Sequence, residues 1–254
     1  MSHQESYYRH NQAYAEFIAG WDDEGCYEKY ADTLKPGTAR ARVLDVGCGV
    51  GTAVARLSSA GFEAYGVEVS EPMIAKARES NPRCQLYDGR TLPFPDKHFA
   101  AVGALNVLEH VDEPEAFVAE IVRVVAPGGR IVLSSPNFYR VIGFRDYHPR
   151  MRGLGNKWRN WRRLRSKRQE MRASPSTVRF DRMPPITNEP FSTDYDAVVA
   201  TNGLDIGFSL ERNGCVVESV SCTDRYVAAP LDWLLNLGPW RYLMLNSFVI
   251  GRRI

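Results

Sequence analysis

Short runs of apolar residues alternate with stretches whose apolar residues recur at helical spacing between residues 42 and 136. Runs of this kind are typical of buried parallel strands, and the stretches between them are typical of helices that cover a sheet. The pattern therefore predicts an α/β fold in which helices cover both faces of a mainly parallel sheet. The predicted strands are 42–47, 63–69, 84–88, 99–107 and 130–136, and the predicted helices are 52–61, 70–80 and 113–125.

Signals outside this region extend the fold at both ends. Residues 11–35 carry apolar side chains at helical spacing and are followed by Pro36 and Gly37, which predicts a helical N-terminal segment. The alternation stops at about residue 138 and resumes near 194, where a helical region is expected to run to Gly214. Strands at 215–222 and 242–253 and turns at 126–129 and 237–240 complete the pattern.

The composition fits one soluble domain. The chain has 254 residues, of which 44% are hydrophobic and 24% charged, so it can bury a core without disulfides. Its five cysteines are irregularly spaced and no Cys/His cluster has ligand spacing, so we expect reduced thiols, a cytoplasmic location and no metal site. The N-terminus lacks the apolar core of a secretory signal, and no apolar run approaches the ~20 residues of a membrane span.

A glycine-rich turn follows the first predicted strand, in the sequence VLDVGCGVG at 43–51. Its glycines allow a tight turn and bring backbone N–H groups close to a ligand at a helix N-terminus. Thr52 stands where the dinucleotide fingerprint has its third glycine. Asp45 would repel a pyrophosphate, but it suits a ligand with positive groups, such as the ammonium and sulfonium of S-adenosylmethionine (SAM).

Acidic residues also end the next two predicted strands. Glu68 lies 17 residues after Gly51, at the place where an acid hydrogen-bonds the hydroxyls of a ribose. Asp88 and Gly89 end the third strand, where a carboxylate can accept a hydrogen bond from an adenine amino group. Together with Asp45, these positions favour a positively charged nucleoside such as SAM over a dinucleotide.

The chain resembles the class I SAM-dependent methyltransferases, and above all the bacterial small-molecule (type 11-like) group that includes enzymes of quinone biosynthesis. The likeness is carried, in order, by VLDVGCGVG, GVEVSEPMI, LYDGRTLPFPDKHFAAVGALNVLEHV and APGGRIVLSSPN over roughly residues 40–137, with a weaker likeness at 200–253. It implies a Rossmann-like fold with a seven-stranded, mostly parallel sheet. It also implies SAM as methyl donor and S-adenosylhomocysteine as product.

The resemblance assigns roles to the residues at matching positions. Gly47, Gly49 and Gly51 would form the loop beneath the methionine part of SAM, with Cys48 in that loop as a packed thiol. Asp45 would meet the ammonium through water or a backbone amide, and Glu68 would hold the ribose hydroxyls. Val69 and Met73 would sandwich the adenine, Asp88 and Gly89 would contact its edge, and Asn106 and Val107 would lie near the sulfonium. A plain core position is the alternative for Met73.

The sequence says less about the acceptor. NVLEH stands where resembling amide and amine methyltransferases carry an N/D-P-P-F/Y turn, so we expect methylation at oxygen. His110 and His148 are candidate general bases, since a neutral imidazole accepts protons near neutral pH. The alternatives are a structural cap for His110 and a surface position for His148. Asn137 and Tyr139, just past the fifth strand, are expected to face the acceptor.

A basic segment follows the fifth strand. Residues 143–190 hold 13 basic and 4 acidic residues, a net charge of +9, which leaves −7 for the rest of the chain. The densest part, KWRNWRRLRSKRQEMR at 157–172, fits three interpretations: a lid helix over the site, a recognition surface for an anionic acceptor, or a docking surface for nucleic acid or a membrane. An insertion at this place lies over the acceptor site in the resembling fold, which favours the lid.

We therefore expect a single domain with four parts. A helical cover (1–38) precedes the SAM-binding core (39–137), an inserted basic lid or acceptor segment (138–193) and the C-terminal part of the sheet (194–254). The expected reaction is O-methylation of a small or medium-sized acceptor, such as a sugar, glycolipid or natural-product intermediate. The alternatives are an RNA or protein methyltransferase that docks through 157–172, and a SAM-binding regulator without activity.

Overall fold

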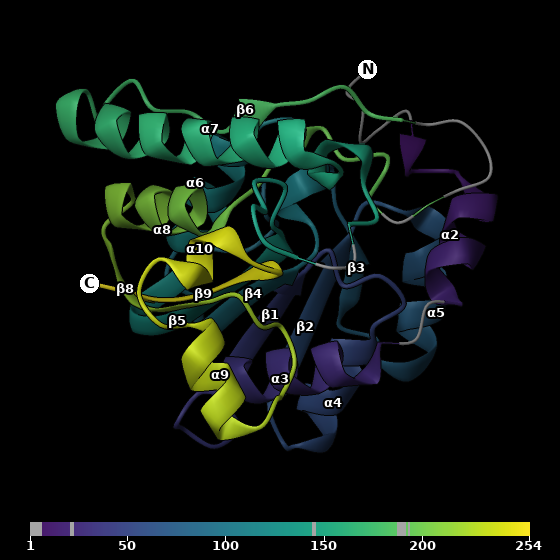
Figure 1. Cartoon of the computed structure of the whole chain (residues 1–254). Helices are drawn as coiled ribbons and strands as arrows, with labels where there is room; N and C mark the ends of the chain where they lie inside the picture. The colour runs from purple at the N-terminus through teal and green to yellow at the C-terminus, as the bar shows by residue number, and fades with distance from the viewer. Residues whose placement is uncertain (1–6, 21–22, 144–145, 187–191, 193) are drawn as a thin grey trace.

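A seven-stranded sheet with the strand order β3-β2-β1-β4-β5-β9-β8 forms the centre of the computed structural model (Figure 1). The structure describes residues 7–20, 23–143, 146–186, 192 and 194–254. The first five strands pair in parallel and β9 is antiparallel to both of its neighbours, which confirms the seven-stranded, mostly parallel sheet that the resemblance implied. The strands are β1 (Arg42–Val46), β2 (Glu63–Glu68), β3 (Cys84–Leu86), β4 (Phe99–Leu105), β5 (Val125–Pro136), β8 (Cys215–Ser221) and β9 (Asn246–Arg253).

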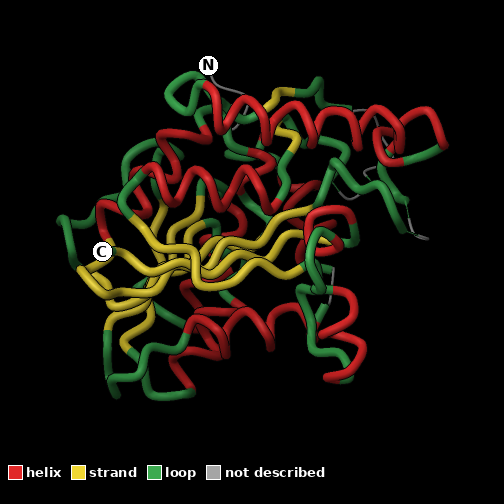
Figure 2. The backbone as a smooth tube through the Cα atoms, turned by 60° about the vertical axis from the view of Figure 1, so that its left-hand side comes forward, coloured by secondary structure: helices red, strands yellow, loops and turns green. Residues whose placement is uncertain are grey.

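Helices cover both faces of this sheet, which lies between two helical layers in Figure 2. Neighbouring residues of one strand point to opposite faces. Val43 therefore packs with α3, α4 and α5, whereas Leu44 packs with α6 and α8. The helices are α2 (Gln12–Ala19), α3 (Glu24–Leu34), α4 (Thr52–Ser59), α5 (Glu71–Ser80), α6 (Pro114–Val124), α7 (Leu154–Ala173), α8 (Gly203–Arg212), α9 (Ala229–Leu235) and α10 (Trp240–Leu243), with 3-10 turns η1 (Leu108–His110) and η2 (Pro149–Met151).

Four predicted elements have different bounds in the structure. The helical stretch 11–35 is two helices, because Asp23 caps a new helix by accepting a hydrogen bond from the Cys26 N–H. The turn predicted at 126–129 is an irregularity within β5, where pairing shifts from Phe99–Val125 to Ala101–Arg130. The helix predicted over 194–214 begins only at Gly203, and the strand predicted from 242 begins at Asn246, after α10.

The basic helix α7 belongs to the segment inserted between β5 and α8, and it lies beside α8 (Figure 1). Its Lys167 is fully buried and forms a 2.7 Å ion pair with Asp205 of α8 and a 3.4 Å ion pair with Asp181 of the short strand β6 (Asp181–Arg182). Arg163 also pairs with Asp181, at 2.8 Å. Part of the positive charge of the segment therefore holds α7 against the fold.

The rest of the insertion packs around a small apolar cluster of its own. Buried Leu164 of α7 meets Phe138, Tyr139 and Met151, together with Ala200 of strand β7 (Val199–Ala200), which pairs with β6. No described helix combines the length and the apolar character that crossing a bilayer requires.

Candidate active site

A cavity opens at the carboxyl ends of β1, β2 and β4, between the N-terminal helices and the end of the inserted segment. This is the edge of a parallel sheet at which ligands bind in folds of this kind. The residues that line it are Tyr8, Tyr14, Phe17, Ile18, Asp23, Cys26, Tyr27, Asp45, Gly47, Cys48, Gly49, Glu68, Val69, Ser70, Met73, Tyr87, Leu105, Asn106, Val107, His110, Ser192, Asp194 and Asp196.

Gly47 and Gly49 of the glycine turn form the floor of the cavity, whereas the third predicted glycine, Gly51, packs against Ala77 and is not among the lining residues. Gly47, Gly49 and Gly51 all have positive φ angles, of 73°, 53° and 87°, which favour glycine. A Cβ atom at position 47 would collide with the side chain of Val107, so glycine is also required there by packing. A Cβ at position 49 would meet no atom within 4 Å. The backbone at Gly49 is therefore open to close approach by a ligand.

Glu68 is fixed in place by the backbone around it. Its Oε1 accepts hydrogen bonds from the N–H groups of Val69 and Ser70, at 2.8 and 3.0 Å, and its Oε2 accepts one from Gly49 at 3.0 Å. Burial raises the pKa of Glu68, and these three donors oppose that rise. A carboxylate offers about four acceptor positions, so one remains for a ligand hydroxyl.

Asp45 lies at the end of β1 and is buried beneath the glycine turn. Its Oδ1 accepts a 2.6 Å hydrogen bond from the Tyr30 hydroxyl of α3. Burial raises its pKa to about 7, although the Tyr30 hydrogen bond opposes this. A positive ligand group in the cavity would therefore relieve an unfavourable buried charge.

Five other predicted contact residues also reach the cavity: Cys48, Val69, Met73, Asn106 and Val107. Met73 is both a core residue and a lining residue, so the two interpretations of its role are compatible. Asn106 has a φ of 53°, which turns the chain from β4 into η1.

Asp88 and Gly89 do not belong to the lining. The Oδ1 atom of Asp88 instead accepts hydrogen bonds from the N–H groups of Arg90 and Thr91, both at 2.8 Å, and so stabilises a surface turn. Tyr87, the preceding residue, lines the cavity in their place. The predicted contact of Asp88 with an adenine edge therefore stays a prediction.

The structure also places the two predicted acceptor residues elsewhere. Asn137 is fully buried and binds the carbonyl oxygens of Tyr242 and Met244 at 3.0 and 2.9 Å. Tyr139 hydrogen-bonds Asp181 in the cluster beneath α7. Asn137 therefore joins the end of β5 to α10 and the residue after it, Tyr139 packs within the inserted segment, and neither side chain is among the residues that line the cavity.

His148 likewise lies away from the cavity. Its Nδ1 accepts a hydrogen bond from the Arg150 N–H at 3.1 Å, which caps η2. Burial lowers its pKa to about 4, assisted by Arg150 and Arg152. The structure gives this imidazole a capping role, and His148 is not among the residues that line the cavity.

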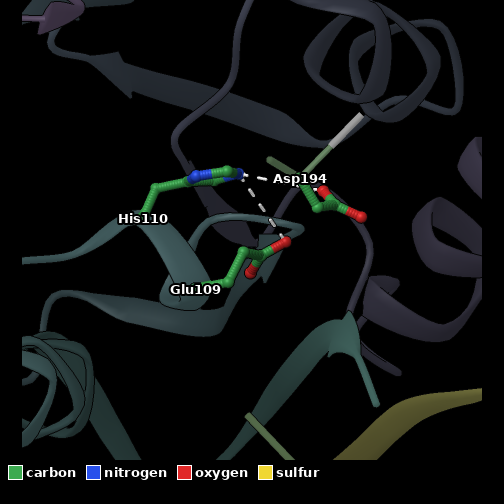
Figure 3. Close-up of side chains that lie close together, drawn as sticks. All are labelled: Glu109, His110 and Asp194. Carbon is green, nitrogen blue, oxygen red and sulfur yellow. Dashed lines mark ion pairs between the residues drawn. The ribbon is translucent and has the colours of Figure 1, made fainter. Parts of the chain in front are cut away.

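His110 does face the cavity and lies between acidic side chains (Figure 3). Its Nε2 is 3.9 Å from Glu109 Oε1 and 4.0 Å from Asp194 Oδ1, and its Nδ1 is 3.6 Å from Asp196 Oδ2. Burial lowers the pKa of His110, but these carboxylates outweigh it and the pKa is raised. Burial raises the pKa of Glu109 to about 8, against the opposing effect of His110.

Sequence reasoning did not identify two parts of this site. Tyr8, Tyr14 and Phe17 contribute its aromatic wall, and Asp194 and Asp196 contribute its acidic end. The tyrosines near the N-terminus and the motif DYD at 194–196 were the available signals. Neither signal could be assigned to the site from the sequence, because only the fold brings the N-terminal segment into contact with residues nearly two hundred positions further along the chain.

The cavity is acidic. Its lining contains five carboxylates (Asp23, Asp45, Glu68, Asp194 and Asp196), and none of the described lining residues is lysine or arginine. The basic helix α7 contributes no described residue to the walls, so its charge does not serve the cavity directly. Such a site favours a ligand with positive groups.

Comparison with known proteins agrees with this geometry. Residues 44–133 match the family model of a methyltransferase domain. A stretch of 112 residues is 36% identical to 2-methyl-6-phytyl-1,4-hydroquinone methyltransferase of Synechocystis sp., and it covers 42% of this chain and 34% of that protein. Another of 108 residues is 33% identical to ubiquinone biosynthesis O-methyltransferase of Aromatoleum aromaticum, and it covers 40% of this chain and 46% of that protein.

These curated relatives are matched over less than half of their length. The fold is matched over more of the chain. The crystal structure of an S-adenosylmethionine-dependent methyltransferase from Mesorhizobium loti superposes with a TM-score of 0.59, at 17% identity, over 91% of this chain and 99% of that chain. The expected Rossmann-like α/β fold is thereby confirmed.

Proposed function

We propose that the chain is a SAM-dependent methyltransferase of the class I superfamily, which transfers the methyl group of SAM to a small acceptor and releases S-adenosylhomocysteine; the methyltransferase family match over residues 44–133 and the methyltransferase relatives support this. The observation that carries this proposal is the acidic cavity above the glycine turn. It combines an open backbone at Gly49 with two buried carboxylates, Asp45 and Glu68.

The residues of the cavity fit SAM better than an anionic nucleotide. Glu68 has one acceptor position left for a ribose hydroxyl, and Asp45 gains from a nearby ammonium or sulfonium. Val69, Met73 and Tyr87 offer apolar surface for an adenine ring. SAM supplies an electrophilic methyl group on sulfur, so the chain must mainly hold the acceptor in line with it.

We assign the acceptor to the far end of the cavity, between His110 and the aromatic wall. Tyr8, Tyr14 and Phe17 offer aromatic surface to an acceptor at this end, and His110 and Asp194 offer polar contacts to a hydroxyl. In the reaction the acceptor oxygen gives up its proton to solvent and forms a bond to the methyl carbon, and the carbon–sulfur bond breaks with its electron pair left on the sulfur of S-adenosylhomocysteine. The polar contacts at this end of the cavity suit a hydroxyl, so we propose O-methylation of a sugar, glycolipid or natural-product intermediate.

An anionic acceptor gains no support from the cavity. The arginines expected to recognise it lie on α7, outside the walls, and the lining is itself acidic. Like charges in a buried site repel each other strongly. We therefore favour an acceptor that is neutral at the reacting end, and we regard RNA as a less favourable substrate for the same reason.

Calorimetry with SAM and with NAD⁺ tests the cofactor assignment. We expect wild-type protein to bind SAM and to leave NAD⁺ unbound, because the acidic floor repels a pyrophosphate. Glu68→Ala removes a charged hydrogen-bond acceptor and should weaken SAM binding by about 10- to 100-fold. The matched control is Glu79→Ala, on the exposed side of α5. Equal SAM affinity for Glu68→Ala and wild type would refute the assignment.

A further inference from the structure

Glu109 carries an oxygen atom without a partner in the interior of the protein. The residue is fully buried, and its Oε2 accepts a 2.9 Å hydrogen bond from the Ser135 hydroxyl. Its Oε1 is buried as well and has no hydrogen-bond partner among the described residues. An unsatisfied carboxylate oxygen at such a depth is costly, so the structure points to a ligand there.

The unpartnered atom faces two further donor atoms. Glu109 Oε1, His110 Nε2 and Asp194 Oδ1 lie within 4.8 Å of one another (Figure 3). The distances of 3.9 and 4.0 Å from the imidazole nitrogen to the two oxygens are too long for hydrogen bonds. Two ligands that each lie about 2.0–2.3 Å from one metal ion are about 2.8–3.8 Å apart, so the three side chains would draw together slightly to bind one ion.

The surrounding hydrogen bonds use the other polar side-chain atom of each residue, so that one atom per residue is left to face the other two. The Tyr147 hydroxyl donates to the other oxygen of Asp194 at 2.7 Å, as Ser135 does for Glu109. On His110, the Nδ1 atom is 3.1 Å from the Tyr8 hydroxyl, which itself donates to Asp196. When Nδ1 carries the proton, it can donate a hydrogen bond to the Tyr8 hydroxyl oxygen, which leaves the Nε2 lone pair for a metal, as is usual for ligating histidines.

We propose that Glu109, His110 and Asp194 bind one divalent cation. Two carboxylates and one imidazole suit Mn²⁺ or Zn²⁺, with the remaining positions open to water or to the acceptor. In the proposed methyl transfer, on which this role rests, the ion holds the acceptor oxygen and lowers the pKa of its hydroxyl. The proton passes to solvent, and the oxygen then attacks the methyl group. This would make His110 a metal ligand and not the base.

Titration of the full-length protein with Mn²⁺, followed by electron paramagnetic resonance, tests the site without SAM or acceptor. Wild type should bind one Mn²⁺. Asp194→Asn should weaken this binding by about 100-fold or more, since loss of an outer contact alone costs about 10- to 100-fold. Asn is well tolerated at this position because the φ of Asp194 is 59°. Glu109→Gln, which keeps its shape and its contact with Ser135, should have the same effect.

Glu79→Gln is the matched control. Glu79 is exposed on α5 and contributes no atom to the proposed site, so the variant should keep Mn²⁺ affinity within about threefold. The proposal is overturned if wild type binds no Mn²⁺ at millimolar concentration, or if Asp194→Asn and Glu109→Gln bind it as tightly as wild type does. Failure to bind SAM in calorimetry would instead refute the proposed function, and it would leave the result for the metal standing.

Discussion

The hydroxyl of Tyr8 donates a 2.6 Å hydrogen bond to Asp196 Oδ2, and this bond joins two segments that lie 188 residues apart in the sequence. The same hydroxyl lies 3.1 Å from His110 Nδ1. The N-terminal cover and the end of the inserted segment thus meet at the histidine of the cavity. A contact of this kind can close the site around an acceptor.

Tyr8→Phe should lower the free energy of unfolding by about 1–3 kcal/mol, because it leaves the buried Asp196 carboxylate short of a donor. Urea denaturation measures this loss. Tyr226→Phe is the control, since Tyr226 is exposed and its 3.1 Å hydrogen bond to Asp32 lies in solvent. A loss no larger than that of the control would mean that Tyr8 does not hold the two segments together.

Gly47→Ala and Gly49→Ala should separate folding from ligand binding. Both residues have a positive φ, which costs alanine about 1–2 kcal/mol. Only position 47 adds a collision, with Val107, so Gly47→Ala should destabilise the protein more, as thermal unfolding would measure. Gly49→Ala should instead fold and lose SAM affinity in calorimetry, because its methyl group enters the open floor. Equal stability of the two variants would contradict the claim that a methyl group at position 47 collides with Val107.

The carboxyl of Asp45 should make the stability of the ligand-free protein depend on pH. Its folded pKa of about 7 lies above the unfolded value of ~3.9, so the native state holds the proton more tightly. The stability that this provides is fully present below about pH 4 and is lost as pH rises through 7, by about 4 kcal/mol at most. The groups that face this carboxyl are Tyr30, Glu68 and Cys48.

Urea denaturation of wild type and Asp45→Asn at pH 5 and pH 8 tests this dependence. The difference in stability between the two proteins should shift in favour of Asp45→Asn at the higher pH, because asparagine carries no charge to bury. Glu79→Gln on the surface of α5 should show no such shift. If the wild-type and Asp45→Asn curves stay parallel from pH 5 to 8, the carboxyl of Asp45 does not titrate in this range.

Lys167→Ala should destabilise the protein by about 3–5 kcal/mol, because it leaves the buried Asp205 without its ion-pair partner. Arg162→Ala on the exposed face of the same helix should change the stability by no more than about 0.5 kcal/mol. Chemical denaturation of both variants compares the two positions directly. Similar small losses would show that the charge of α7 does not anchor it to α8.

The sheet could be predicted from the sequence because its strands are buried on both faces and stand out as apolar runs. Each predicted strand of the core corresponds to one in the structure, with differences only at the ends. The helix predicted over 194–214 begins later in the structure, at Gly203, and a physical reason explains the difference. Asn202 is the N-cap, accepting a hydrogen bond from the Leu204 N–H, and the apolar residues before it belong to β7 and the cluster beneath α7.

The part of the cavity formed by Gly47, Gly49 and Glu68 could also be predicted, since the ends of the neighbouring parallel strands β1 and β2 bring these residues together. The opposite end of the cavity could not, because long-range packing decides which residues reach it. Asn137 and Tyr139 follow β5 directly, yet their side chains are buried in other contacts and do not line the cavity. Asp194 and Asp196 lie more than fifty residues further along the chain, yet they line the cavity. The sequence pattern alone cannot show which of these residues reach the cavity.

Incubation with SAM that carries a labelled methyl group, in a cell extract separated afterwards into small molecules, protein and RNA, tests the central claim most directly. The wild-type protein should release S-adenosylhomocysteine and place the label in the small-molecule fraction, and Glu68→Ala should do so far more slowly. SAM binding without any S-adenosylhomocysteine, or label found only in protein or RNA, would contradict a methyltransferase that acts on small molecules.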